Sequence, residues 1–265
     1  MAIPLFQVDA FTNHPFSGNP AAVCLLSSPR DDDWMQAVAA EMNLSETAFV
    51  VIHDQDAQLD LRWFTPTMEV DLCGHATLAA AHALWSSHRV SNIAKIQFAT
   101  KSGLLECRQV GDWIEMDFPV TPVSPQEAPA ELCEALGVQS RRTARSPFDW
   151  LIEMPDEKAV RNISPDFQKL AKVKCRGAIV TARSEDPQFD FVSRFFAPAS
   201  GINEDPVTGA AHCALVDFWE KPLGKSTFVA RQISKRGGVV SVRREKNRAI
   251  LAGQAMTVIT GELCD

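Results

Sequence analysis

The sequence predicts a mixed α/β fold built from two pseudo-symmetric halves, in each of which a curved mixed sheet wraps around a central helix. The first two observations behind this prediction concern the helices and the segments around them. A helix with almost no polar face occurs twice, as ATLAAAHALW after Gly74 and as AAHCALVDFW after Gly209. A helix without a polar stripe is normally enclosed on every side. Short alternating apolar segments surround each helix, and this alternation is typical of strands.

An internal repeat is the third observation behind the fold class. The segment LDLRWFTP resembles VSRFFAP, so that Arg62 matches Arg194, 132 residues later. The glycines at the two helix starts lie 135 residues apart. A chain of 265 residues also has the length of about two domains. We therefore expect one half at residues 1–118 and another at 119–265, with the Pro-rich segment 119–131 as linker; the last strand could return to the first half.

The predicted elements follow the same order in both halves. In the first half, an aspartate of the run 31–33 caps a helix that stops at Asn43, and a strand follows. In the second half, the Ser-Pro pair at 164–165 starts a helix that also leads into a strand. Downstream, each half contains two alternating strands joined by a Lys-x-Gly turn, at Lys101 and at Lys235.

Composition and charge exclude several classes of function. Hydrophobic residues make up 46% and charged residues 22% of the chain, which is an ordinary globular balance. The net charge of −7 argues against nucleic-acid binding. The basic run at 243–248 follows an alternating segment and indicates a solvated hairpin turn. Seven scattered cysteines without a CxxC pair favour a reduced, cytoplasmic protein. We expect neither export nor a membrane span, because no signal peptide and no long apolar segment is present.

Glu46 is the first candidate catalytic residue. It lies in the segment LSETAFV, where strand alternation puts Leu44, Glu46, Ala48 and Val50 on one otherwise apolar face. The repeat matches Glu46 with Ala178, so the second half has no acid at this place. An acid on an apolar face either has a partner or has a raised pKa, and the second outcome suits a general acid or base near neutral pH. A strand-end glutamate bonded to a backbone amide is the alternative.

The two helix starts, Cys73-Gly74-His75 and Thr208-Gly209-Ala210, are candidate anion-binding sites. A helix N-terminus carries unpaired N–H groups and the positive end of the helix dipole. Two such ends facing one cleft would hold a carboxylate or a developing enolate.

The polar residues that the repeat does not share identify further candidates. Asp205 has Val70 as its counterpart, and His75 has Ala210. Together with Glu46, these two residues form the predicted catalytic set. A symmetric cleft that carries asymmetric acids would give proton transfer a single direction.

Four segments resemble signature segments of the PhzF family, which is named for phenazine biosynthesis, and together they span essentially the whole chain. They are DAFTNHPFSGNPAAVCLL, NLSETAFV, FTPTMEVDLCGHATLAAAHAL and NEDPVTGAAHCAL. The resemblance implies a diaminopimelate epimerase-like fold with an active site between two domains. It also implies a cofactor-independent isomerase that acts on a small carboxylic acid.

The resemblance assigns roles to individual residues. Glu46 matches the family's catalytic glutamate, which takes a proton from carbon and returns it elsewhere on the same acid. His75 and Asp205 match residues that orient the substrate and assist this transfer. Gly18 and Asn19 match a loop that lines the same cleft. The predicted substrate-binding residues are Gly18, Asn19, Cys73, Gly74, Thr208, Gly209 and Ala210.

Two positions depart from the relatives. This chain has Ala210 where the PhzF isomerase has a serine, so one substrate contact of that isomerase is missing here. Epimerases of the same fold use two cysteines, one at each helix start, whereas Cys73 here has Thr208 as its mate. A threonine hydroxyl is too weak an acid to replace a thiol. One-base transfer by Glu46 is preferred, and thiol chemistry at Cys73 is the alternative.

Other interpretations concern metals, binding and assembly. Cys73, His75, His82, His212 and Cys213 suggest a metal site, but His75 and His82 are two helical turns apart, which is too far for one ion. No metal is therefore expected, and the resemblance to the PhzF family implies that no cofactor is needed. A non-catalytic protein that binds small acids is the second alternative. An edge strand or the outer helix could pair two chains, which leaves a homodimer open.

Overall fold

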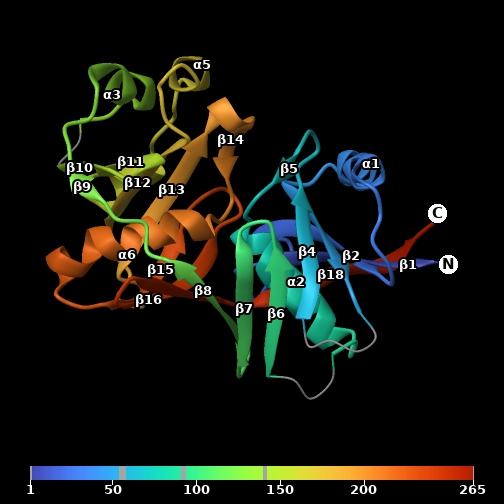
Figure 1. The fold of residues 1–265 in the computed structure, drawn as a ribbon. Helices are drawn as coiled ribbons and strands as arrows, with labels where there is room; N and C mark the ends of the chain where they lie inside the picture. Colours follow the sequence, from blue (N-terminus) through green and yellow to red (C-terminus); the bar gives the residue numbers. More distant parts are fainter. Residues whose placement is uncertain (1, 54–57, 91–93, 140–141, 265) are drawn as a thin grey trace. The chain divides into compact units, whose positions relative to one another are not determined.

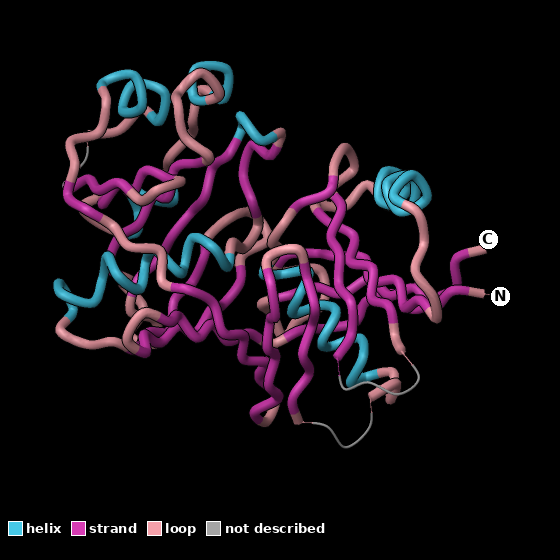
Figure 2. Tube along the Cα trace, in the orientation of Figure 1, coloured by secondary structure: helices cyan, strands magenta, loops and turns pink. Residues whose placement is uncertain are grey.

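The structure is a computed structural model that describes residues 2–53, 58–90, 94–139 and 142–264. Figure 1 shows the chain by sequence position and Figure 2 by secondary structure. The chain divides into two compact units, of which the first is Met1–Phe118 with Ala252–Asp265 and the second is Pro119–Leu251. Within the described residues, no helix is long and apolar enough to cross a membrane.

The first unit contains a mixed sheet with the strand order β18, β1, β2, β3, β4, β6, β7, β8. The β2–β3 and β4–β6 pairs are parallel, the other pairs are antiparallel, and the short β5 pairs with β4. The strands are β1 (Ile3–Ala10), β2 (Asn19–Leu26), β3 (Glu46–Val51), β4 (Gln58–Phe64), β5 (Glu69–Val70), β6 (Lys95–Thr100), β7 (Gly103–Val110), β8 (Trp113–Pro119) and β18 (Ala255–Leu263).

Helix α2 (Gly74–Ser86) is the central helix of this unit. It packs against β1, β2, β3 and β18, and nine of its thirteen residues are buried. Six of its residues are alanine or glycine, so the strands can approach the helix closely. The predicted burial of this helix is confirmed.

Helix α1 (Asp32–Met42) covers the opposite face of the sheet. The carboxylate of Asp31 accepts a hydrogen bond from the backbone N–H of Trp34 at 2.8 Å, and Asn43 ends the helix in the left-handed conformation. Both predicted helix signals are therefore confirmed. Phe49 and Phe64 meet edge to face beneath the helix, with ring centroids 5.6 Å apart, and form part of the cluster that holds it.

The second unit repeats this arrangement of strands. Its sheet has the order β9, β10, β11, β12, β13, β15, β16, with β14 beside β13. From β10 to β16 the pairs alternate between antiparallel and parallel, as they do from β1 to β7. The strands are β9 (Ser124–Pro125), β10 (Arg142–Arg145), β11 (Asp149–Glu153), β12 (Gly177–Arg183), β13 (Phe191–Ala197), β14 (Ile202–Asp205), β15 (Thr227–Gln232), β16 (Gly238–Glu245) and β17 (Arg248–Gly253).

Helix α6 (Gly209–Leu223) is the counterpart of α2. It packs against β16 and is largely buried. The helices α3 (Ala130–Leu136), α4 (Glu157–Arg161) and α5 (Phe167–Leu170) belong to the other side of this sheet, with Val180 and Phe196 in the shared apolar cluster. The helix predicted from the Ser-Pro pair at 164–165 is the single turn α5, and its N-cap is Asp166 rather than Ser164.

Side-chain contacts follow the repeat as closely as the strands do. The guanidinium group of Arg62 makes a bidentate hydrogen bond with the carboxylate of Glu69, and Arg194 makes the same bond with Glu204. Each arginine also lies over the phenylalanine two residues later.

The strand register corrects two of the predicted equivalences. Phe49 pairs with Arg62, and Val180 pairs with Arg194, so the counterpart of Glu46 is Gly177 rather than Ala178. A Cβ atom at Gly177 would lie 2.4 Å from the ring of Phe195, which leaves no room for an acid.

The two Lys-x-Gly turns also differ. Thr100 pairs with Gly103 across a two-residue turn, whereas Gln232 pairs with Gly238 across a five-residue loop, so Lys101 and Lys235 are not equivalent. The equivalent residues are Ser102 and Ser234, which lie 132 residues apart. The hydroxyl of Ser102 donates to the carbonyl of Asp71, and that of Ser234 donates to the carbonyl of Pro206, both at 2.7 Å.

Candidate active site

Glu46 and His75 meet in the interior of the first unit. Glu46 is the first residue of β3 and lies on the face that packs against α2, while His75 is the second residue of α2. The Nε2 atom of His75 lies 3.1 Å from Oε2 of Glu46, and the two side chains are 6% and 12% exposed. Neither atom has a hydrogen-bond partner among the described residues, so this ion pair is what compensates their burial. Of the two predicted outcomes for Glu46, the structure gives the one in which it has a partner.

Cys73 lies on the other side of the same imidazole ring. Its Sγ atom is 3.4 Å from Nδ1 of His75. Burial, followed by the charge of Glu46, raises the pKa of the Cys73 thiol. Burial by itself would lower the pKa of His75, but the charges of Cys73 and Glu46 and the contacts with both residues raise that pKa above its ordinary value. We attribute the rise mainly to Glu46, because a thiol with a raised pKa keeps its proton and carries no charge.

Glu46, Cys73 and His75 bring three potential metal ligands together. Their potential ligand atoms lie within 4.8 Å of one another. However, Cys73 approaches Nδ1 and Glu46 approaches Nε2, so the imidazole ring stands between the sulfur and the carboxylate. One ion at the usual ligand distances of about 2.0–2.3 Å would have to contact both sides of that ring. The residues therefore do not fit a metal ion.

His82 and His212, the other two histidines that the sequence suggested as metal ligands, bond groups outside the cluster of Glu46, Cys73 and His75. His82 Nε2 lies 3.0 Å from the hydroxyl of Thr257, and burial lowers its pKa. His212 is fully buried in α6 and bonds the carbonyl of Thr208. Neither contacts the cluster around His75 through these bonds.

Asp205, Thr208 and Gln232 form a buried polar group in the second unit. The hydroxyl of Thr208 donates to Oδ2 of Asp205 at 2.5 Å. Gln232 Nε2 donates to the carbonyl of Asp205 at 2.7 Å, and Gln232 Oε1 accepts the backbone N–H of Thr208 at 2.9 Å. The sequence analysis did not identify Gln232. The one sequence signal for it is that a polar residue stands on the buried, alternating face of β15.

This group uses one backbone amide of the predicted anion site at the second helix start. The backbone N–H of Thr208 is already taken by Gln232, so this amide is not available to a ligand. Gly209 and Ala210 begin α6 as expected. In the first unit, Gly74 begins α2 directly beside Cys73 and His75.

The loop that contains Gly18 and Asn19 leads into β2 next to β3. Gly18 has a φ of 67°, and a Cβ atom there would lie 2.2 Å from the carbonyl oxygen of Ala10, so this position requires glycine. The buried carboxylate of Asp9 accepts the backbone N–H of Phe16 at 2.7 Å, which holds the loop. Asn19 is fully buried at the start of β2, two residues before Ala21, which pairs with Glu46.

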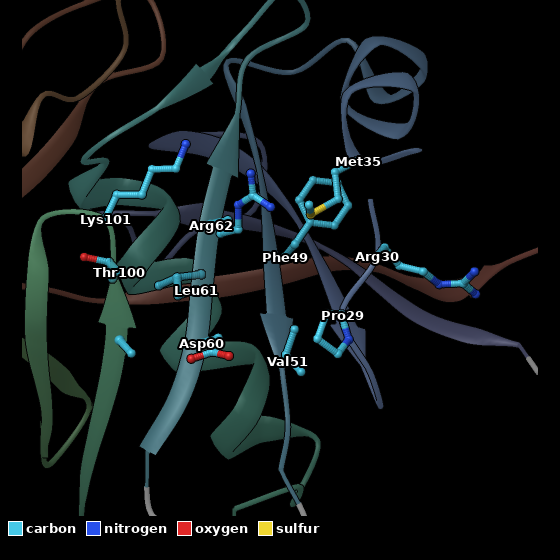
Figure 3. A pocket seen from close by; sticks show the side chains of 11 residues that line it. Pro29, Arg30, Met35, Phe49, Val51, Asp60, Leu61, Arg62, Thr100 and Lys101 are labelled. Carbon is cyan, nitrogen blue, oxygen red and sulfur yellow. The ribbon is translucent and has the colours of Figure 1, made fainter. Parts of the chain in front are cut away.

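A cavity of about 370 Å³ lies elsewhere in the first unit, as Figure 3 shows. Phe49 and Val51 of β3 line it, together with Met35, Arg62 and Lys101. Alternation along β3 puts Phe49 and Val51 on the face opposite to Glu46. The cavity is therefore separate from the cluster of Glu46, Cys73 and His75. The predicted site residues fall into two groups, one in each unit.

His212 gives a prediction for stability against pH. Its Nδ1–H donates to the carbonyl of Thr208 at 2.8 Å, as the hydroxyl of Thr77 does to the carbonyl of Cys73 in α2. Burial lowers the pKa of His212 from 6.5 to about 4. His212 therefore binds a proton more readily in the unfolded chain than in the folded one. The free energy of unfolding has its full value above pH 6.5 and falls by about 3 kcal/mol as the pH drops to about 4.

The variant His212→Asn isolates this effect, because the asparagine amide can replace the Nδ1–H donor and does not titrate. Urea unfolding at several pH values should show wild type losing stability relative to the variant as the solution is acidified. A constant difference between the two proteins would contradict the prediction.

The structural comparisons first establish the class of fold. A hydroxyproline epimerase from Agrobacterium vitis superimposes with a TM-score of 0.66 at 10% identity, covering 99% of this chain and 92% of that one. The chain therefore has an epimerase-like mixed α/β fold. A PhzF family protein from Enterococcus faecalis superimposes with a TM-score of 0.94 at 39% identity over 100% of both chains.

The sequence comparisons then establish the family. The pattern of the PhzC-PhzF family, described as phenazine biosynthesis-like protein, matches residues 8–261. An uncharacterized isomerase of Halalkalibacterium halodurans is 50% identical over 264 residues, with 99% of each chain covered. The human phenazine biosynthesis-like domain-containing protein is 41% identical, again with 99% of each chain covered. The chain belongs to the PhzF family.

Proposed function

We propose that the protein is a cofactor-independent isomerase that moves a proton on a small carboxylic acid, with Glu46 as the single acid and base. The observation that carries this proposal is the buried pair of Glu46 and His75 at the start of the central helix of the first unit. A carboxylate that is removed from water and held at a helix N-terminus suits general acid–base chemistry.

The proposal gives each predicted residue a task. Glu46 takes a proton from one carbon of the substrate and returns it to another. His75 presents Nε2 to Glu46 and stabilises the carboxylate before the proton is taken. Asp205, which Thr208 and Gln232 hold within the second unit, is assigned to orienting a polar group of a substrate. Gly18 and Asn19 lie at the start of β2, the strand that pairs with β3, and Gly74 begins α2; we assign these three residues to substrate binding.

Relatives support the reaction class. Three proteins that are 45–50% identical to this chain over 99% of its length, one from Halalkalibacterium halodurans and two from Pseudomonas aeruginosa, are named as uncharacterized isomerases. Two-base thiol chemistry is less favoured, because the pKa of Cys73 is raised and the matching position holds Thr208.

Exchange of carbon-bound hydrogen tests the proposal. The wild-type chain is incubated in heavy water with a panel of small hydroxylated or unsaturated carboxylic acids, and deuterium at carbon is followed by NMR. We expect incorporation into at least one acid without added cofactor. Binding of an acid without any incorporation would instead support a non-catalytic binding protein.

A single-turnover experiment separates one base from two. A substrate that carries deuterium at the abstracted position is converted in ordinary water. With Glu46 as the single base, part of the label should reappear at the second carbon, because the same carboxyl group carries it there. Complete loss of the label during normal turnover would favour the thiol alternative at Cys73.

A further inference from the structure

The N-cap residues of the two central helices share an unusual feature. An N-cap side chain normally accepts a hydrogen bond from a backbone N–H in the first turn of its helix. Cys73 caps α2 and Thr208 caps α6, both in extended conformation, and within the described residues neither side chain makes a capping hydrogen bond of standard geometry, although the backbone of Ala76 also interacts with the sulfur of Cys73. Each side chain is turned toward a candidate site residue. Cys73 contacts His75, and Thr208 contacts Asp205.

We propose that Cys73 is a positioning residue, which holds Nδ1 of His75 through its thiol and thereby keeps an N–H on Nε2 facing Glu46. Thr208 does the corresponding work for Asp205. This inference rests on the proposed function of Glu46 as the base, and it assigns the two N-cap side chains to orientation of the site rather than to helix capping or to nucleophilic chemistry.

The two nitrogens of His75 make this role specific. In a neutral imidazole, one nitrogen carries the proton and the other accepts a hydrogen bond. If the proton were on Nδ1, the lone pair of Nε2 would face the carboxylate oxygen of Glu46 at 3.1 Å, and two acceptors would repel each other. A thiol that donates to Nδ1 favours the other tautomer, in which Nε2–H faces the carboxylate of Glu46.

The thiol can serve both protonation states of His75. Because burial and Glu46 raise the pKa of Cys73, the thiol keeps its proton and can donate it to the neutral ring. When His75 is protonated, both ring nitrogens carry protons, and the sulfur becomes the acceptor for Nδ1–H. In either state Nε2–H points at Glu46. Alanine offers neither a donor nor an acceptor, whereas serine offers both.

Among the described residues, the other buried cysteines make no hydrogen bond with a histidine side chain. Burial also raises the pKa of Cys24 and of Cys213, and both lie within packed elements, in β2 and α6. Of the described cysteines, Cys73 is the one that hydrogen-bonds a histidine side chain. A packing role alone would not explain why this sulfur faces the ring that also meets Glu46.

Nitrogen NMR tests the inference without a substrate. Spectra of the full chain labelled with ¹⁵N at histidine are recorded across the titration of His75 for wild type, Cys73→Ala and Cys73→Ser. We expect neutral His75 to carry its proton on Nε2 in wild type and in Cys73→Ser. In Cys73→Ala we expect a mixture of tautomers. His82, which bonds Thr257, is the internal control and should not change.

The result that overturns the inference is equally direct. If His75 keeps the same tautomer and the same titration in Cys73→Ala as in wild type, Cys73 does not position it. A Cys73→Ser protein that resembles Cys73→Ala would overturn it as well, since the hydroxyl can make the same contact. Thr208→Val and Thr208→Ser form the matched pair for the second unit, with the carboxyl carbon shift of Asp205 as readout.

The exchange reaction provides a second readout. Cys73→Ala should lower kcat by between about 10- and 100-fold with little change in KM, because the proton-transfer geometry is loosened while the substrate contacts remain. Cys73→Ser should recover most of kcat. An equal loss in both variants would point to a thiol that itself reacts. Absence of exchange in wild type, together with the expected NMR result, would remove the isomerase function and leave the positioning role standing.

Discussion

Replacement of Glu46 by glutamine is expected to reduce carbon–hydrogen exchange on the substrate by about 10²- to 10⁴-fold. Glutamine has nearly the same shape as glutamate but cannot take up the proton. The amide can still meet Nε2 of His75, so the fold and the binding of the acid should persist. Exchange is measured in heavy water by NMR, and binding of the acid is measured by calorimetry on the same preparation.

The control for Glu46→Gln is Glu41→Gln, on the exposed face of α1 in the same unit. This variant should exchange at the wild-type rate. If Glu46→Gln retained full activity, Glu46 would not be the base, and the proposed mechanism would have to be abandoned. A loss of binding together with a loss of the folded state would be recognised by circular dichroism.

Replacement of Arg194 by methionine is expected to destabilise the chain by about 3–5 kcal/mol, because one partner of a largely buried ion pair is removed. The Arg194 side chain is 12% exposed. It bonds both carboxylate oxygens of Glu204, and its Nη1 also donates to the carbonyls of Val160, Arg161 and Ile163. The variant leaves Glu204 and the end of α4 without these donors. Urea unfolding measures the loss.

The internal repeat supplies a matched control for this variant. Arg62 makes the same contact with Glu69, but its side chain is 29% exposed, and Lys101 also pairs with Glu69. Arg62→Met should therefore cost only about 1 kcal/mol. Equal losses for the two variants would show that burial does not set the difference between the two pairs.

Gln232 illustrates what local sequence patterns cannot supply. It comes from β15, more than twenty residues after Thr208, and reaches the start of α6 because β15 lies beside β13 in the sheet. Alternation indicates that position 232 is buried, but it does not say which polar groups lie opposite. The matching of Glu46 with Ala178 failed for a related reason. A fixed offset ignores a one-residue shift between strands, and strand pairing places Gly177 there instead.

The sequence alone determined the duplication, the two enclosed helices and the limits of α1, because each depends on residues close together in the chain. Alanine-rich helices without a polar face must be enclosed, and the Asp31 cap and the Asn43 stop act within one turn. Only the tertiary structure decided that Glu46 pairs with His75, and that the sulfur of Cys73 faces Nδ1 of the same imidazole ring. Those contacts depend on strand register and side-chain direction, which are set when distant segments pack together.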